Sequence, residues 1–377
     1  MKSLLPTLLV ILPLSATAAS FNEKVDAIFS ELNTTDGPGC SVGVMKNSEF
    51  IHKSAYGMAN LELGVALSPD SVFRMASVSK QFTAMAVQIL AQQGKIDLSK
   101  DIRTYLPELP DYGHKVSINA IIGHSAGMGD YDMITDDLME EPAPKGVKLK
   151  SVAGGEFRLG NQDYLTIKEF YDVVKTAPLR HAPNEKTDYS NLGYFLLAML
   201  VEEVSGQTLR EFAEQHMFKP LNMKSTFFSD DPVEIIPNRA TGYKPNKDKT
   251  GYVTDMTNLF WVGDGGLHTN LEDMAKWDKN YYEPVIGPKP QALIDTMNTP
   301  NSDLPIFEKY LYANGQVKGE HFGHQGYMHG GGWLGTRTGY VRYPESGLSV
   351  AIMCNNAAAN ASTEYLEKVV EAYFEEN

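Results

Sequence analysis

The sequence lacks the features that several classes of protein need. It has only two cysteines, Cys40 and Cys354, among 377 residues. Two are too few for a four-ligand cysteine site, and the chain has no His-Glu-x-x-His motif. We therefore expect no metal and no cofactor. The chain has 33 lysines and arginines and 47 aspartates and glutamates, which gives a net charge of −14. This balance argues against nucleic acid or an anionic membrane as a partner.

Long apolar runs are also absent, except at the start of the chain. Lys2 precedes an apolar run at residues 4–14, and small residues follow it as far as Ala19. A basic start, a short apolar stretch and an A-x-A site are typical of a secretory signal peptide, and the run is too short to span a membrane. We expect residues 1–19 to be cleaved and the mature protein to be periplasmic or secreted, without stable insertion in a membrane.

The rest of the chain is long enough for one large domain. Strand-like segments occur near both ends, at 40–45, 49–54, 335–343 and 347–355. Helical spacing is clearest at 77–93, 192–204 and 361–374. Strands at both ends with helices between them predict a mixed α/β fold, in which the two ends form one sheet and a helical region is inserted.

Ser77 and Lys80 form the only Ser-x-x-Lys pattern in the chain. On a helix, residues three positions apart share a face, so the ammonium of Lys80 can reach the hydroxyl of Ser77. A serine hydroxyl is a weak nucleophile until a base takes its proton. A lysine can be that base only if burial or a nearby cation lowers its pKa. The alternative is a chance tetrapeptide at the start of an ordinary helix.

Ser125 is a second candidate nucleophile, because residues 123–127 read Gly-His-Ser-Ala-Gly, the nucleophile-elbow pattern of α/β-hydrolases. That elbow needs a buried strand before the serine and a helix after it. The isoleucines before Ser125 have helical spacing, and the residues after it are a poor helix start. The glycine-rich segment at 329–332 follows this serine, whereas an oxyanion loop should precede it. We rank Ser125 below Ser77, with a turn between helices as the alternative.

Residues 73–84, Phe-Arg-Met-Ala-Ser-Val-Ser-Lys-Gln-Phe-Thr-Ala, resemble the active-site helix of the serine β-lactamase-related hydrolases. This family includes class C β-lactamases, D-Ala-D-Ala carboxypeptidases, D-amino-acid peptidases and esterases. The similarity continues in order along nearly the whole mature chain, at residues 93–98, 121–128, 189–194 and 263–267. The stretch at 121–128 fits a family segment that reads LLTHTSGL, which accounts for the Gly-x-Ser-x-Gly pattern.

The resemblance implies a role for each residue of the second motif. Tyr189 would pass protons between Ser77, Lys80 and the leaving group. Asn191 would hold Lys80 and bind a substrate amide. A second Tyr-x-Asn pattern begins at Tyr312, and we rank it well below Tyr189, with a surface loop as the alternative.

The third family motif is a strand that carries Lys/His-x-Gly, and two registers compete here, His324 and His329. We prefer His329, because Gly335 and Pro344 follow it at the spacing seen in the family. His329 would then line the site, and Gly331 and Gly332 would contact the substrate. The resemblance implies an oxyanion hole made of the backbone N–H groups of Ser77 and Gly332.

The resemblance thus implies an exported serine hydrolase that forms an acyl-enzyme on an amide or ester, with a small-molecule or peptide substrate. Most β-lactamases have lysine where His329 stands, which favours a peptidase or esterase with weak or no β-lactamase activity. Three alternatives remain open: a true class C-like β-lactamase, an α/β-hydrolase esterase that uses Ser125, and a non-catalytic wall-binding protein of the same fold. Residues 129–163 match no family segment.

The resemblance also implies the β-lactamase/transpeptidase-like fold. It would form a single domain at 20–377, with an antiparallel sheet from both chain ends, flanking helices and a helical region at roughly 84–260. In that fold the first and last strands are antiparallel neighbours, which would bring Cys40 and Cys354 together. Two alternatives stay open: a disulfide, which needs Cα atoms within about 7 Å of each other, or two buried, reduced cysteines.

Overall fold

The computed structural model describes residues 19–133, 165–256 and 262–376. Most of the predicted signal peptide and most of the unmatched segment at 129–163 lie outside these ranges. Within the described ranges, no helix has the length and apolar character needed to cross a bilayer.

The main sheet joins the two ends of the chain. Eight strands of the described chain form it, in the order β10-β11-β12-β13-β14-β15-β1-β2, and every neighbouring pair is antiparallel. The strands are β1 (Cys40–Lys46), β2 (Glu49–Tyr56), β10 (Pro305–Phe307), β11 (Tyr310–Ala313), β12 (Gln316–His321), β13 (His324–Trp333), β14 (Thr336–Tyr343) and β15 (Leu348–Cys354). The predicted strands near the start and near the end of the chain are confirmed, as is the antiparallel sheet.

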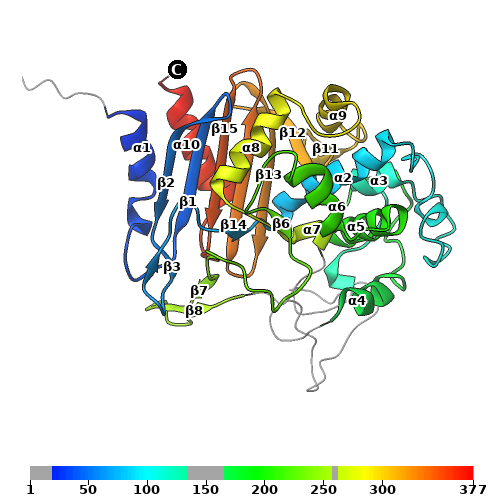
Figure 1. The fold of residues 1–377 in the computed structure, drawn as a ribbon, viewed down its shortest axis with the longest axis horizontal. Coiled ribbons are helices and arrows are strands. Elements are labelled where there is room, and N and C mark those ends of the chain that lie inside the picture. Colours follow the sequence, from blue (N-terminus) through cyan, green and yellow to red (C-terminus); the bar gives the residue numbers. More distant parts are fainter. Residues whose placement is uncertain (1–18, 134–164, 257–261, 377) are drawn as a thin grey trace, which may run out of the picture.

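Alternate residues of the central strands belong to two separate cores. Val42 of β1 and Val350 of β15 pack with apolar side chains of α1 (Phe21–Ile28) and α10 (Leu366–Phe374). These two helices lie together on one side of the sheet (Figure 1). Met353 of β15 belongs instead to the larger core that includes the other helices. Because both faces of the central strands are covered, their sequences are almost continuously apolar.

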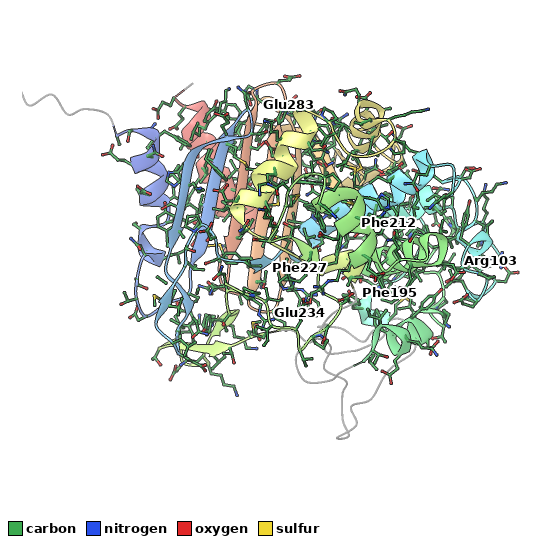
Figure 2. All side chains as sticks on the ribbon, in the orientation of Figure 1. Arg103, Phe195, Phe212, Phe227, Glu234 and Glu283 are labelled. Atoms are coloured by element: carbon green, nitrogen blue, oxygen red, sulfur yellow. A yellow bond between two sulfur atoms is a disulfide. The ribbon has the colours of Figure 1, made fainter. Side chains whose placement is uncertain are left out.

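The remaining helices pack on the other face of the sheet and beside it (Figure 1). They are α2 (Lys80–Gln92), α3 (Ile118–Ile122), α4 (Ile167–Val174), α5 (Asn191–Ser205), α6 (Leu209–Ala213), α7 (Val262–Gly265), α8 (Leu271–Tyr282) and α9 (Pro290–Met297). Helix α8 contacts β1 and β15, while α2 packs against α5. Figure 2 shows Phe195 of α5 and Phe212 of α6 among the packed side chains of this region, and Arg103 at its outer edge. The helices predicted at 77–93, 192–204 and 361–374 are confirmed.

Short elements complete the chain. Three small sheets have the orders β3-β4, β5-β9-β6 and β7-β8. Their strands are β3 (Met58–Asn60), β4 (Val65–Ala66), β5 (Phe73–Arg74), β6 (Phe227–Phe228), β7 (Tyr243–Pro245), β8 (Tyr252–Thr254) and β9 (Leu267–Thr269). The short helical turns are η1 (Ser30–Leu32), η2 (Ala76–Ser79), η3 (Ile102–Thr104), η4 (Tyr131–Met133), η5 (Glu214–Phe218) and η6 (Ala361–Tyr365). Two of them open predicted helices: η2 precedes α2, and η6 precedes α10.

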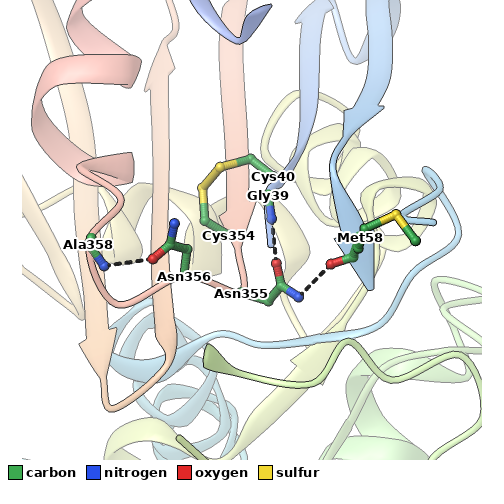
Figure 3. The surroundings of a disulfide bond; sticks show 7 residues. All are labelled: Gly39, Cys40, Met58, Cys354, Asn355, Asn356 and Ala358. Atoms are coloured by element: carbon green, nitrogen blue, oxygen red, sulfur yellow. Dashed lines mark hydrogen bonds between the residues drawn. A yellow bond between two sulfur atoms is a disulfide. The ribbon is translucent and has the colours of Figure 1, made fainter. Parts of the chain in front are cut away.

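A disulfide ties the first strand to the last. Cys40 begins β1 and Cys354 ends β15, and the two residues are direct partners in the antiparallel register. Their Cα atoms are 4.0 Å apart and their sulfur atoms are bonded (Figure 3). Beside the bond, the Asn355 side chain accepts a hydrogen bond from the Gly39 N–H and donates one to the carbonyl oxygen of Met58. Of the two alternatives for the cysteines, the structure has the disulfide.

Candidate active site

Ser77 stands in the tight turn η2, directly before α2. The preceding residue, Ala76, has φ of 46°, a conformation that non-glycine residues rarely adopt and that often occurs at functional sites. The turn is held from the sheet, because the Thr338 hydroxyl donates a hydrogen bond to the carbonyl oxygen of Met75 at 2.8 Å. As a result the Ser77 side chain is only half-buried and lines an open cleft beside β13.

Lys80 is fully buried one helical turn after Ser77. Its Nζ lies 3.1 Å from the Ser77 Oγ, 2.6 Å from the Asn191 Oδ1 and 2.8 Å from the backbone carbonyl oxygen of Asp264. Burial lowers the pKa of Lys80 to about 8, although the carboxylates of Asp264 and Asp130 act in the opposite direction. Burial has this effect because it penalises the charged ammonium more than the neutral amine.

These three contacts suit a neutral amine, which has two N–H bonds and one lone pair. The Asn191 Oδ1 and the Asp264 carbonyl oxygen can only accept hydrogen bonds. In the neutral form both N–H bonds of Lys80 are therefore used by these two oxygens. The lone pair is then left for the Ser77 hydroxyl, the third contact of Nζ.

Tyr189 and Asn191 reach the site from the start of α5. Ser190 lies between them and caps this helix with its side chain. The Nζ of Lys80 lies 4.8 Å from the centroid of the Tyr189 ring. The Tyr189 hydroxyl is buried and has no hydrogen-bond partner among the described residues. Burial raises its pKa well above the ordinary value, and the nearby Ser77 side chain offsets part of this effect.

His329, rather than His324, lies beside Ser77. Both histidines belong to β13, five residues apart, so their side chains point to opposite faces of the strand. His329 lines the cleft together with Ser77 and Tyr189. His324 instead stacks on Phe374 of α10, with the ring centroids 4.1 Å apart.

The surroundings of His329 fix its tautomer. Its Nδ1 lies 2.6 Å from the carbonyl oxygen of Gly330, which can only accept, so Nδ1 carries the proton. Its Nε2 then accepts a hydrogen bond from the Tyr312 hydroxyl at 3.0 Å. Burial, with a smaller contribution from the positive charge of Lys80, lowers the pKa of His329 to about 4. The imidazole is therefore neutral near pH 7 and has no charge to offer a substrate carboxylate.

Tyr312 corrects one of the sequence interpretations. We gave a surface loop as the alternative, but Tyr312 lies on β11, is 2% exposed and donates its hydrogen bond to His329 inside the site. The sequence did contain a signal for this. Residues 310–313 read Tyr-Leu-Tyr-Ala and precede Asn314-Gly315, which is the pattern of a strand followed by a tight hairpin turn.

Gly331 and Gly332 lie on the edge of the cleft, in β13. Gly331 is buried against η2, and a Cβ there would collide with the carbonyl oxygen of Met75 and the Thr338 hydroxyl. A side chain at this position would therefore push the strand away from Ser77. Gly332 is exposed and borders the cleft beside Ser77.

Two aspartates of the site, the half-buried Asp130 and the buried Asp264, were missed by sequence reasoning. Asp130 accepts hydrogen bonds from the backbone N–H of Asn191 at 3.2 Å and from its side-chain amide at 3.0 Å. Burial raises the pKa of Asp130 to about 6. Asp264 accepts a hydrogen bond from the Tyr131 hydroxyl, and burial raises the pKa of this carboxyl as well. Asp130 lies in the unmatched segment 129–163, and the resemblance at residues 263–267 implied no role for Asp264.

Ser125 has surroundings that do not suit a nucleophile. It is 1% exposed, and its hydroxyl donates to the Asn184 Oδ1 at 3.0 Å. Helix α3 precedes it, where a nucleophile elbow needs a strand. Its neighbour His124 accepts a hydrogen bond from the Ser190 N–H at 3.1 Å, and the His124 ring packs 4.3 Å from that of Tyr189. The Ser125 turn thus supports the segment that carries Tyr189.

The cleft beside Ser77 is open and has a volume of about 850 Å³. Tyr189 and His329 border it near Ser77. The β10–β13 end of the sheet adds four large side chains of mainly apolar character to the wall, and charged or polar groups lie among them: Phe307, Tyr310, Val317 and Met328, with Glu308, His321 and Arg337. Such a cleft can hold a ligand of several residues with apolar side chains.

The family described as Beta-lactamase matches residues 25–373. The chain belongs to the β-lactamase family. The resemblance seen in the sequence is thereby confirmed.

Individual proteins that the chain resembles are named as a peptidase, a penicillin-binding protein homologue and an amidase. The D-aminopeptidase of Gluconobacter oxydans is 25% identical over 342 residues, which are 90% of this chain but 60% of the relative. The chain thus spans less than two thirds of the length of that relative. The octameric penicillin-binding protein homologue from Pyrococcus abyssi has a TM-score of 0.76 at 23% identity, over 95% of this chain and 77% of that chain.

A D-amino acid amidase from Ochrobactrum anthropi, complexed with L-phenylalanine amide, has a TM-score of 0.73 at 20% identity, over 94% of this chain and 99% of that chain. Both solved structures are less than 25% identical to this chain, so they bear on the fold alone. They confirm the predicted β-lactamase/transpeptidase-like fold.

Proposed function

We propose that this chain is an exported serine hydrolase that cleaves an amide or ester bond through an acyl-enzyme on Ser77. The observation that carries the proposal is the buried amine of Lys80, 3.1 Å from the Ser77 Oγ and with a pKa of about 8. A base with a pKa near the working pH combines a useful fraction of the free form with enough affinity for the proton. Export is supported by the signal-peptide features and by the disulfide, which suits an oxidising compartment.

In the acylation step, the Ser77 Oγ attacks the carbonyl carbon of the substrate and its proton passes to the Nζ of Lys80. The carbonyl oxygen becomes an oxyanion, which the backbone N–H groups of Ser77 and Gly332 would stabilise. The bond to the leaving group then breaks, and the leaving nitrogen or oxygen takes a proton. Tyr189 is placed to deliver this proton, because its ring lies beside Lys80 and its buried hydroxyl lies near Ser77.

In the deacylation step, water attacks the ester carbon of the acyl-enzyme and gives a proton to the same network. The bond between the carbon and the Ser77 Oγ breaks, the serine recovers its proton and the acid leaves. Neither step calls for a cofactor, because the protons move only between Ser77, Lys80, Tyr189, water and the leaving group. Asn191 holds the Nζ of Lys80 in place throughout, at 2.6 Å.

The neutral His329 favours peptide and ester substrates over β-lactams in this proposal. A β-lactam antibiotic carries a carboxylate, and a charged lysine at this position would attract that carboxylate more strongly than a neutral imidazole does. We therefore expect slow or absent turnover of β-lactams and cleavage of short acyl esters or D-amino-acid peptides. Efficient hydrolysis of a cephalosporin by the purified protein would contradict this assignment.

The decisive experiment is to label the purified protein with a fluorophosphonate and, separately, with a fluorescent penicillin. Peptide mass mapping then locates each label. We expect the fluorophosphonate on Ser77, and no label in a Ser77→Ala variant. Label on Ser125 would favour an α/β-hydrolase mechanism. A protein that takes up neither label and hydrolyses no ester would point to a non-catalytic protein of the same fold.

A further inference from the structure

Ser77 lies between two spaces of very different size. One is the open cleft of about 850 Å³. The other is a cavity of about 40 Å³, whose wall includes Tyr131, Asn191, Asp264 and Trp333. Among the described residues, Ser77 and Gly332 border both spaces. These two residues carry the N–H groups proposed above for the oxyanion, so a carbonyl carbon bonded to the Ser77 Oγ would lie where the two spaces meet.

Asp264, which lines the small cavity, has a carboxylate oxygen that no described residue hydrogen-bonds. Asp264 is 6% exposed, and its Oδ2 accepts the hydrogen bond from the Tyr131 hydroxyl. Its Oδ1 is buried and has no hydrogen-bond partner among the described residues. A buried acceptor of this kind is costly, and in native proteins it commonly has a functional or ligand-binding explanation.

We propose that this cavity binds the protonated α-amino group of the substrate, with the Asp264 Oδ1 as its acceptor. The substrate class is then an amide or ester of an amino acid, or a peptide with a free N-terminus. This inference rests on the proposed function, because it concerns the acyl part of the same acyl-enzyme. It assigns to Asp264 a role in specificity that is separate from the proton transfers of Ser77, Lys80 and Tyr189.

The sizes of the two spaces agree with this assignment. In an α-amino acyl group, the nitrogen is two bonds from the carbonyl carbon, so it must lie close to Ser77. An ammonium group is about as large as a water molecule, and the cavity of about 40 Å³ exceeds the roughly 10–15 Å³ that one water needs. A leaving group or a large side chain does not fit there and belongs in the 850 Å³ cleft.

The buried charges also favour a cation at this point. The carboxylates of Asp264 and Asp130 act on Lys80, while Arg74, which is half-buried, is a second cation that acts on Asp264. The Arg74 Nε is held by the carbonyl oxygen of Gly265 at 3.0 Å. Within this group of four residues, when Lys80 is neutral and acts as the base, two carboxylates face one cation, Arg74. A substrate ammonium restores the balance, and it favours the neutral form of Lys80 by like-charge repulsion.

The aromatic side chains of the cavity add to this preference. Tyr131 and Trp333 both line it, with their ring centroids 5.7 Å apart. Aromatic rings attract ammonium groups, most strongly in sites shielded from water. The cavity therefore combines one carboxylate oxygen with aromatic walls, which is a favourable environment for a small cation.

The test compares three substrates that differ only at the α-position: alanine p-nitroanilide as each enantiomer, its N-acetyl derivative, and propionyl p-nitroanilide, which lacks the amino group. The measured quantity is the ratio of kcat/KM for the free amine to kcat/KM for the propionyl compound. We expect the wild-type ratio to be about 10 to 100, the range for a charge-assisted contact with a buried group. It should fall above about pH 8, where an α-amino group loses its proton. The propionyl compound corrects for the titration of Lys80, Asp130 and Asp264.

The Asp264→Asn variant should lower this ratio by about 10-fold or more, whatever its absolute rates, because the amide keeps the shape but not the charge. Asp255→Asn is the matched control. Asp255 is also 6% exposed, but it pairs with Lys244 at 2.7 Å and does not line this cavity. Its ratio should equal that of the wild type. Thermal unfolding of each variant verifies that the fold is retained.

The outcomes separate this inference from the proposed function. A wild-type protein that hydrolyses all three substrates without preferring the free amine overturns the inference and leaves the serine mechanism standing. A preference that survives in Asp264→Asn overturns it too. If Asp264→Asn slows all three substrates equally and the acyl-enzyme accumulates, the cavity serves the attacking water and the assignment is wrong. If no substrate, and no p-nitrophenyl ester, is hydrolysed, the proposed function itself fails.

Discussion

Two turns of this molecule carry a serine, at Ser77 and at Ser125. Their backbone conformations are similar, but the exposure and the contacts of the two serines differ. Each serine follows a residue with positive φ, 46° at Ala76 and 59° at His124. Ser77 is half-buried, borders a cleft and contacts a buried amine. Ser125 is 1% exposed and contacts the side-chain amide of Asn184. A sharp turn and a matching sequence pattern are therefore not enough to identify a nucleophile, because a nucleophile must also be accessible to substrate and contact a base.

The two turns are also connected, which explains why the second one is present. His124 accepts the N–H of Ser190 and packs against the ring of Tyr189. The backbone of Asp188 adds a hydrogen bond to the carbonyl oxygen of His124 at 2.8 Å. The Ser125 turn thus fixes the segment that brings Tyr189 to Ser77. One turn carries the proposed chemistry, and the other holds one of its partners.

The largest effect should come from removing each serine in turn. Ser77→Ala should lower kcat for a p-nitrophenyl ester by more than about 10³-fold, because the acyl-enzyme no longer forms. Ser125→Ala removes a buried hydroxyl and should leave most of the activity. Stopped assays of ester hydrolysis with both purified variants decide the matter. The opposite pattern would reverse the roles of the two turns.

The next largest effect should come from replacing the residues that contact the two serines. Lys80→Ala and Tyr189→Phe should each lower kcat by about 10²–10⁴-fold, the usual range for a proton-transfer group. The double variant should lose far less than the product of the two factors, because both residues serve one proton network with Ser77. Asn184→Ala removes the partner of Ser125 and is the matched control, for which we expect little change. Independent, multiplicative losses would count against a shared network.

A smaller effect should follow from loosening the contact between the two turns. His124→Ala should lower kcat by about 10- to 100-fold with KM nearly unchanged, because Tyr189 loses its support and small displacements of a catalytic group are costly. His124→Asn keeps an acceptor for the Ser190 N–H and should recover part of the rate. Steady-state kinetics and thermal unfolding of both variants check this. Equal losses in the two variants would show that the hydrogen bond to Ser190 is not what matters.

The sequence predicts the sheet well, because its central strands have a clear apolar pattern on both sides. The sequence does not decide whether the two cysteines form a disulfide, and the reason is physical. Neighbouring first and last strands bring Cys40 near Cys354, but a shift of one residue in the register turns one side chain to the opposite face. The pairing of Cys40 with Cys354 is fixed only when the whole ladder from Ser41–Met353 to Lys46–Leu348 has formed.

Some residues of the site can be predicted from the sequence, and others cannot. Ser77 and Lys80 follow from helical spacing, and Tyr189 with Asn191 from the resemblance to a family. Asp264 could not be found this way, because what matters is its contact with Tyr131, 133 residues earlier in the chain. Its role depends on burial, which raises the pKa of the carboxyl. No local pattern reports a contact between segments so far apart, and this limits what any single sequence shows of a buried charge network.

The smallest predicted effect tests the electrostatic difference between the two turns, since only Ser77 has a titrating partner. The profile of kcat/KM against pH reports groups of the free enzyme. Lys80 must be neutral to take the proton of Ser77, so activity should rise with pH and level off above its pKa of about 8.

The carboxylate of Asp130 raises the pKa of Lys80. Asp130→Asn should therefore move the midpoint to lower pH, by roughly half a pH unit or more. The plateau itself can fall, because Asp130 also orients Asn191. A midpoint that stays in place or moves upward would mean that Lys80 is not the group whose titration limits the reaction.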